Sequence, residues 1–291
     1  MSTAETVIGR TPRGDRVRGG IFKAALIFSI GVGFVLLGAL LVSVVVKGIS
    51  WLDPLFFSNP QSADPAKAGA RPAILGTLYM MVLLILMAVP IGVGTAVYLE
   101  EYADRERWYN RTLEVNIQNL AAVPSIVYGI LGLGFLVRGL GLGRVLLAGA
   151  MILTLLVLPI IIVAGREAIR AVPDSIRQGA YALGATKWQV VSRQVLPAAI
   201  PGIATGSILA LARAIGETAP LLLIGALTYV AVNPTPLGSF TVLPVQIYQW
   251  IARPQDDFRE LAAAGIIVLL AILLTMNAFA IWLRNRYQRR W

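Results

Sequence analysis

An arginine and a glutamate stand four residues apart inside an otherwise apolar run of the sequence. Arg213 and Glu217 occur in the segment LARAIGETAPLL, within a run from residue 202 to residue 230. Residues four apart share one face of a helix, so the two side chains can form an ion pair. Arg213 is about eleven residues into the run, which at about 1.5 Å per residue predicts a position near the middle of a membrane. A charge there costs about 2.5 to 10 kcal/mol, so we expect the pair to face protein or water.

The pair admits two interpretations. It can lock its helix against neighbouring helices, as ion pairs inside membranes do. Alternatively, Arg213 lines a path for an anion, because a guanidinium group donates several hydrogen bonds to phosphate-like oxygens, and Glu217 keeps that binding weak enough for release. Pro220 cannot donate to the carbonyl of Gly216, so we expect it to loosen the helix beside the pair.

The side chains on which most enzymes depend are missing. The chain has no Cys and no His, which excludes disulfides, thiolate nucleophiles, His acid–base pairs and the usual zinc or haem sites. No segment matches GxxxxGK[ST], so we do not expect this chain to hydrolyse ATP by itself. We expect no enzymatic activity, no cofactor and no metal. Three classes of protein remain: a subunit of an ATP-driven importer, an ion-coupled secondary carrier and a membrane-embedded enzyme. We find no internal repeat of the kind that secondary carriers usually have.

The composition is that of a membrane protein. Hydrophobic residues make up 57% of the chain and charged residues 14%, and the mean hydropathy is +0.75. Because backbone groups in lipid must satisfy one another and the apolar runs exceed the length of a barrel strand, the spans are expected to be helices. We predict an all-α membrane protein with six transmembrane helices, at residues 21–46, 73–99, 117–137, 145–164, 202–230 and 261–283.

The remaining segments are assigned as tails and loops. Residues 1–20 are predicted to be a disordered tail, and residues 285–291 a basic C-terminal tail. Gly202 and Gly206 form a GxxxG pair that permits close helix packing. The loop 233–260 contains LPVQIYQWIARPQDDF, in which we expect a short helix on or in the membrane interface.

The distribution of basic residues predicts the orientation. The net charge is +10, and most Lys and Arg residues fall in the two tails and the segments 105–111 and 166–193. Under the positive-inside rule these segments, and therefore both termini, are expected in the cytoplasm of a bacterial cell, with the chain in its inner membrane. The charge is thus explained by the lipid bilayer, and we expect no nucleic acid partner.

A polar stretch from residue 166 to residue 201 separates two apolar runs. Ser175 to Gln178 and Thr186 to Gln189 both match the capping box that opens a helix. Gly184 between them is suited to the left-handed conformation that ends one, and Pro197 is expected to terminate the second helix. The sequence therefore predicts two short cytoplasmic helices within residues 174–196. They either rest on lipid headgroups through Arg170, Arg177, Lys187 and Arg193 or dock on a partner.

The same stretch resembles the signature of the permeases of ATP-binding-cassette importers. That signature reads Glu-Ala-Ala, three residues of any type, Gly, nine residues of any type, Ile, one residue of any type, and Leu-Pro. In this chain the matching positions are Gln178, Gly179, Ala180, Gly184, Gln194, Leu196 and Pro197. Gln178, Gly179 and Gln194 depart from it. The resemblance implies a type I importer permease fold, in which this stretch couples to a separate homodimeric ATP-binding subunit. It also implies a second homologous permease and an extracytoplasmic binding protein as partners.

Three further segments narrow the resemblance. PSIVYG from Pro124, ARAIGETAPLL from Ala212 and LPVQIYQW from Leu243 are similar to the A-type permeases of phosphate-specific importers, and the similarity covers about residues 73–284. In that family, residues matching Arg166, Arg213 and Glu217 are tied to phosphate passage. The expected function is therefore half of a path for inorganic phosphate. A permease for another oxyanion, sulfate or molybdate, is the alternative within the importers.

Overall fold

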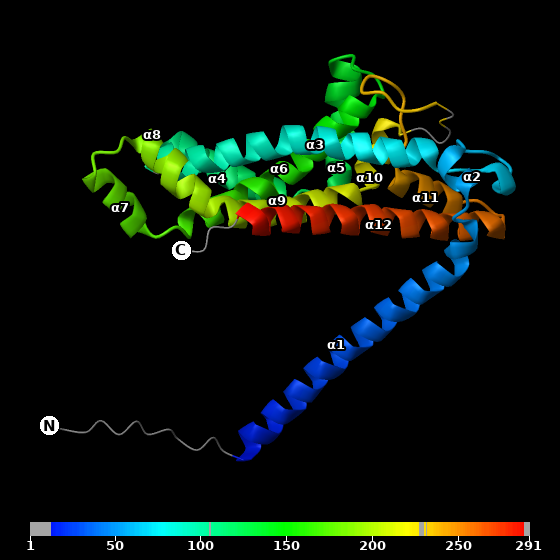
Figure 1. The fold of residues 1–291 in the computed structure, drawn as a ribbon, viewed down its shortest axis with the longest axis horizontal. Coiled ribbons are helices and arrows are strands. Elements are labelled where there is room, and N and C mark those ends of the chain that lie inside the picture. The colour runs from blue at the N-terminus through cyan, green and yellow to red at the C-terminus, as the bar shows by residue number, and fades with distance from the viewer. Residues whose placement is uncertain (1–12, 105, 227–229, 231, 288–291) are drawn as a thin grey trace.

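The computed structural model describes residues 13–104, 106–226, 230 and 232–287, and these residues contain helices and no strands (Figure 1). The α-helices are α1 Arg13–Gly48, α2 Pro54–Ser58, α3 Arg71–Val97, α4 Trp108–Ala121, α5 Ser125–Gly132, α6 Leu146–Arg170, α7 Asp174–Ala182, α8 Lys187–Val190, α9 Leu196–Ile215, α10 Ala219–Ile224, α11 Leu243–Ile251 and α12 Asp256–Tyr287. Three segments have π-helical geometry, namely η3 Tyr98–Tyr102, η4 Leu133–Gly139 and η5 Val191–Val195. Two short 3₁₀ turns, η1 Ile49–Trp51 and η2 Pro65–Lys67, lie between α1 and α3.

Helix α6 forms the centre of the bundle, with α3 and α9 packed along it. Its apolar residues are buried along most of its length, as expected for a helix that is hydrophobic all round. Gly202 and Gly206 of α9 lie directly against Ala168 and Ala164 of α6, where any larger side chain would collide. The predicted GxxxG packing is confirmed, and the pairing shows that α6 and α9 run antiparallel.

Five described helices are long and apolar enough to cross a membrane, and α4 with α5 and η4 makes a sixth if this bent pair is one span. The prediction of six spans is met in that sense, but a straight third span at 117–137 is wrong. The chain bends by 106° between Ala121 and Ser125. Pro124 precedes α5 in an extended conformation, because a proline has no amide with which to continue α4.

Helix α1 stands apart from the bundle. Figure 1 shows it leaving the other helices near α2 and pointing away from them, and its side chains from residue 21 to residue 46 are almost all exposed. Gly48 at its end lies against the backbone of Ala263 and Ala264 in α12. The first predicted span lies within this helix. Residues 13–20, expected in a disordered tail, instead form its first turns, whereas residues 1–12 lie outside the described residues.

The fifth span differs most from the expectation. Residues 187–215 form one helical span through α8, η5 and α9, so Pro197 does not end a helix. The wider π-helical turn at Val191–Val195 shifts the hydrogen-bond register just before the proline, which removes the need for its missing amide. The span ends at Ile215 rather than near 230, and a new helix, α10, begins at Ala219.

Helix α11 confirms the short helix predicted in the loop 233–260, although it is packed inside the protein. Leu243, Ile247 and Trp250 are buried in a cluster with Phe56 and Phe258. Its first amide, that of Leu243, donates to Thr77 Oγ1 of α3 at 2.9 Å. We call this end of the bundle, which also carries α2, the α11 end, and the opposite end the α7 end (Figure 1).

Candidate substrate path and coupling segment

The predicted ion pair between Arg213 and Glu217 is present. Arg213 Nε lies 3.5 Å from Glu217 Oε1; the arginine side chain is 59% exposed in the single chain and the glutamate side chain 17%. Arg213 stands in the last turn of α9, where the carbonyl ends of the helix favour a cation. The span that carries it begins at Lys187 instead of residue 202, but the next residues, Ala214 and Ile215, lie beside Met81 and Leu84 near the middle of α3, so a position near the middle of the membrane stays a prediction.

A break in the helix positions Glu217. Residues 216–218 separate α9 from α10, and the amides of Gly216 and Glu217 bond back to the carbonyls of Arg213 and Ala214 at 3.2 Å. Pro220 lies in the first turn of α10, where its missing amide removes no helical hydrogen bond. The helix that we expected to be loosened beside Pro220 is thus completely interrupted. The interruption places the carboxylate of Glu217 beside the guanidinium of Arg213 at the junction of α9 and α10.

Two of the sequence motifs meet at this break. Gly129 in PSIVYG lies against Pro220 and Leu223, so close that a β-carbon at Gly129 would stand 2.7 Å from the α-carbon of Pro220. Helix α5 therefore supports α10 directly behind the ion pair. The third motif, on α11, packs against α3 and α12 instead and does not join this site.

Arg166 is held elsewhere, by two carboxylates. In the buried Arg166, Nε lies 3.4 Å from Glu100 Oε2 of η3 and Nη2 lies 2.7 Å from Glu114 Oε1 of α4. Arg170 Nη2 also binds Glu100 Oε2, at 3.1 Å. With Gly206 opposite Ala164, Arg166 is about nine residues, or about 14 Å along the helix, from the level of Arg213. The structure does not bring the two arginines together.

The segment expected to couple to an ATPase lies at the α7 end. Gly184 has a φ of +78°, and the predicted capping box at Thr186 is confirmed, with Thr186 Oγ1 accepting from the Gln189 amide and Gln189 Oε1 from the Thr186 amide. The box at Ser175 is wrong. The N-cap of α7 is Pro173, two residues before Ser175, and it makes no side-chain cap, so Gln178 has no capping role.

The signature residues around Gly184 present an open surface. Gln178 and Gly179 are exposed, Ala180 is half-buried, and Leu196 and Pro197 lie half-buried in the first turn of α9. Leu183, 90% exposed, and the exposed Trp188 flank the glycine. On the opposite sides of these helices, Ile176 packs against the apolar core and Val191 is buried.

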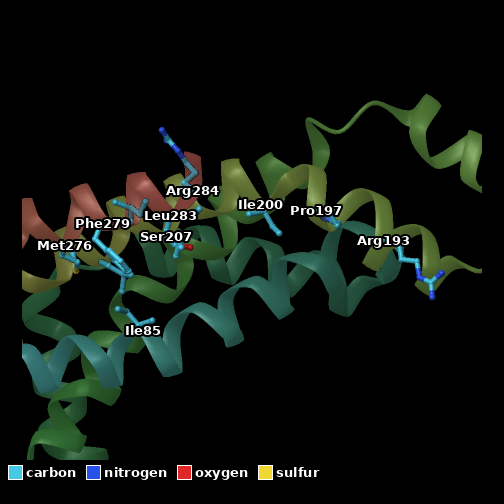
Figure 2. Close-up of a pocket in the computed structure, with 13 residues that line it drawn as sticks. Ile85, Arg193, Pro197, Ile200, Ser207, Met276, Phe279, Leu283 and Arg284 are labelled. Carbon is cyan, nitrogen blue, oxygen red and sulfur yellow. The ribbon is translucent and has the colours of Figure 1, made fainter. Parts of the chain in front are cut away.

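A groove of about 750 Å³ lies between α3, α9 and α12 (Figure 2). Its walls are apolar apart from Ser207 and two arginines, and include Ile85, Ile200, Met276 and Phe279. Figure 2 shows the guanidinium groups of Arg193 and Arg284 directed away from the groove. Neither Arg213 nor Glu217 lines it, and its apolar walls are unsuited to an anion.

Residues 88–291 match the family described as "Binding-protein-dependent transport system inner membrane component". The chain belongs to this family. The permease is 34% identical over 255 residues to the phosphate transport system permease protein PstA of Haemophilus influenzae, covering 86% of this chain and 88% of that one. It is 35% identical over 222 residues to PstA 1 of Mycobacterium tuberculosis, covering 76% and 72%. The probable ABC transporter permease protein YqgI of Bacillus subtilis is 32% identical over 284 residues, covering 92% and 94%.

Solved structures show the same fold. A bacterial ABC transporter involved in the import of the acidic polysaccharide alginate matches with a TM-score of 0.66 at 18% identity, covering 95% of this chain and 99% of that one. The MetNI methionine ABC transporter matches with a TM-score of 0.57 at 19% identity, covering 74% and 92%. The permease is a multi-pass inner-membrane protein with the type I ABC importer permease fold.

Sequence reasoning missed the carboxylate partners of Arg166. Glu100 and Glu114, and Glu101, which binds Arg177, were part of no site predicted from the sequence. Their placement at the end of a span, where carboxylates need cationic partners once buried, was the one available signal. It could not name the arginines, which lie 52 to 76 residues further along the chain.

Proposed function

We propose that the permease forms half of the path of an ATP-driven importer of inorganic phosphate. The observation that carries this proposal is the state of Arg213. Its side chain is more than half exposed in the single chain and faces one carboxylate, Glu217, at 3.5 Å, so an anion can reach the guanidinium group. A guanidinium group pairs well with phosphate oxygens. The similarity to PstA proteins over most of the chain supports phosphate over sulfate or molybdate.

Glu217 limits the affinity of this site in our proposal. A carboxylate 3.5 Å from the guanidinium competes with the anion, which allows release during each cycle. Arg166 acts further along the path, towards the α7 end. Glu100 and Glu114 occupy its donors in this structure, so Arg166 contacts the anion only when one of these carboxylates moves away.

The energy for transport comes from a separate ATPase that binds the α7 end. We place this end and both termini in the cytoplasm. The exposed Leu183 and Trp188 on either side of Gly184 are apolar anchors suited to a cleft in a protein partner. Gln178, Gly179, Ala180 and Gly184 lie on the docking segment, and Leu196 and Pro197 continue it into α9, which carries Arg213 in its last turn.

The complete importer contains further subunits. We propose a second homologous permease, a homodimer of the ATP-binding subunit and an extracytoplasmic phosphate-binding protein. The exposed apolar surface of α1 requires lipid or a protein partner around it. A solved relative, the alginate transporter, was crystallised in complex with a substrate-bound periplasmic protein.

The proposal is tested by uptake into proteoliposomes that contain the assembled complex. With ATP inside and binding protein outside, we expect phosphate to accumulate and an excess of sulfate or molybdate to leave the rate unchanged. Phosphate accumulation without ATP would instead indicate a secondary carrier. Accumulation of sulfate or molybdate, with no phosphate uptake, would replace the substrate and keep the importer.

A further inference from the structure

The π-helical turn η3 connects four elements at the α7 end. Its consecutive residues Glu100, Glu101 and Tyr102 follow α3 and reach α6, α7 and α8 respectively. Glu100 binds Arg166 and Arg170 of α6, Glu101 binds Arg177 of α7, and the Tyr102 ring lies 4.9 Å from Lys187 Nζ of α8. Interruptions of this kind in a helix occur often at functional sites.

Among the basic residues that contact η3, Arg177 makes the largest number of described hydrogen bonds. Its Nη2 donates to Glu101 Oε1 at 2.9 Å and to the Ile169 carbonyl at 2.9 Å, and its Nη1 donates to the Val172 carbonyl at 2.6 Å. The two carbonyls belong to the end of α6 and the residues just after it, where helical partners are lacking. Arg177 and Glu101 are both mostly buried. One guanidinium group therefore fastens α7 to both α3 and α6.

The rest of α7 contributes little to its own attachment. None of its residues is fully buried, and only Ile176 and Ala180 pack partly against the apolar cluster that contains Ile169 and Val195. A nine-residue helix is not stable in water by itself. The orientation of α7 relative to α3 therefore depends on the contact between Arg177 and Glu101.

We propose that Glu101 and Arg177 form a latch that positions α7 and carries its displacement directly to α3. This inference rests on the proposed coupling of α7 to an ATPase. It adds a second route to the continuous helix from α8 through α9. Helix α3 packs along α6 over most of its length, so a force applied at Glu101 reaches the centre of the bundle. Arg177 is a positioning residue, which acts on transport through α7 and α3.

The first experiment measures a distance and needs no transported substrate. The chain has no cysteine, so spin labels can be attached only at Tyr98→Cys in η3 and Ala182→Cys in α7, both exposed. If the latch holds, the distance between the labels in the assembled complex is the same with and without ATP. In the background of Arg177→Gln the distance should change on ATP binding. A change of equal size in the unmodified latch would overturn the proposal.

The second experiment measures substrate imported per ATP hydrolysed in the same proteoliposomes. Arg177→Gln should lower this ratio at least about tenfold, within the range of coupling between sites, with ATP hydrolysis retained. Glu101→Gln, which keeps the two carbonyl bonds of Arg177, should lower it less. Arg177→Lys, which keeps the charge, should restore most of it. Arg259→Gln is the matched control, since Arg259 forms an exposed pair with Asp256 at the other end.

The outcomes separate the latch from the proposed function. Failure of the wild-type complex to import phosphate contradicts the proposed substrate and leaves the distance measurement to decide on the latch. If the wild-type complex imports phosphate and Glu101→Gln keeps its full ratio, the latch is wrong. Should Arg177→Gln fail to assemble, Glu101→Gln still decides on the latch, because it alters the pair and keeps the bonds of Arg177 to the Ile169 and Val172 carbonyls.

Discussion

Two arginines in the same bundle have opposite surroundings. Arg166 is buried and binds two carboxylates, Glu100 and Glu114, whereas Arg213 is exposed and binds one, Glu217, at the longer distance of 3.5 Å. Two carboxylates cancel a guanidinium charge and use its donors, whereas one leaves donors for a ligand. An arginine inside a membrane protein therefore cannot be assigned to an anion path by its residue type alone, because its carboxylate partners determine how much of its charge is available to a ligand.

Gly184→Pro is expected to have the largest effect on transport, because it should detach the ATPase while both arginine sites stay intact. Proline cannot adopt the φ of +78° found here, so α7 and α8 should separate and the ATPase should no longer co-purify. The permease itself should remain in the membrane. Gly94→Ala is the control, since Gly94 lies in α3, outside the docking segment, and a β-carbon there meets no atom within 4 Å. Undiminished co-purification of the ATPase with Gly184→Pro would contradict the coupling role.

Arg213→Gln should abolish phosphate uptake while the complex still assembles. The exposed guanidinium contributes little to packing, so the melting temperature in detergent should stay within a few degrees of the wild type. Arg213→Lys keeps the charge without the bidentate geometry and should retain only part of the uptake. Unchanged uptake in membranes with normal subunit amounts would show that Arg213 is only half of a structural pair.

Arg166→Gln should act mainly on stability. The Glu100 side chain, which is only 4% exposed, would then keep Arg170 as its remaining arginine. Removal of one partner from a buried ion pair lowers the free energy of unfolding by about 3 to 5 kcal/mol. The double variant Arg166→Gln with Glu100→Gln should recover part of this loss. Denaturant titration in detergent measures it. A stable Arg166→Gln variant that has lost uptake would instead support a role in the path.

Glu217→Gln should change kinetics more than the amount of uptake. Without the competing carboxylate, Arg213 should hold the anion more tightly, so we expect a lower KM and a lower maximal rate, each by about twofold to fivefold, which corresponds to about 0.5 to 1 kcal/mol for an ion pair that solvent can reach. Initial rates over a range of phosphate concentrations measure both. A higher KM would mean that Glu217 orients Arg213 rather than competing with the anion.

Glu114→Gln should have the smallest effect on stability. The Glu114 side chain is 40% exposed, and pairs so accessible to solvent contribute about 0 to 1 kcal/mol. Because Glu100 remains bound to Arg166, the charge of the arginine stays largely compensated. A loss as large as that of Arg166→Gln would show that Glu114, and not Glu100, is the main partner.

Local features of the site were predictable because they depend on residues a few positions apart. The pair between Arg213 and Glu217, the left-handed Gly184 and the capping box at Thr186 are all contacts within four residues or single backbone conformations. The errors at Ser175 and Pro197 are also instructive. The N-cap of α7 is Pro173, two residues before Ser175, and a π-helical turn carries the helix past Pro197. Neither shift alters the local pattern that suggested a boundary.

Hydropathy and helical period, which are properties of neighbouring residues, were enough to identify a helical membrane protein and most of its spans. The family and the segment expected to couple to an ATPase came from the resemblance of short motifs to those of known permeases. Only the tertiary structure decided that Glu100 and Glu114 neutralise Arg166, that Glu101 fastens α7 through Arg177, and that PSIVYG supports the break beside Arg213. These contacts join residues 52 to 94 positions apart, and the packing of α3, α5, α6 and α10 sets which of them can form.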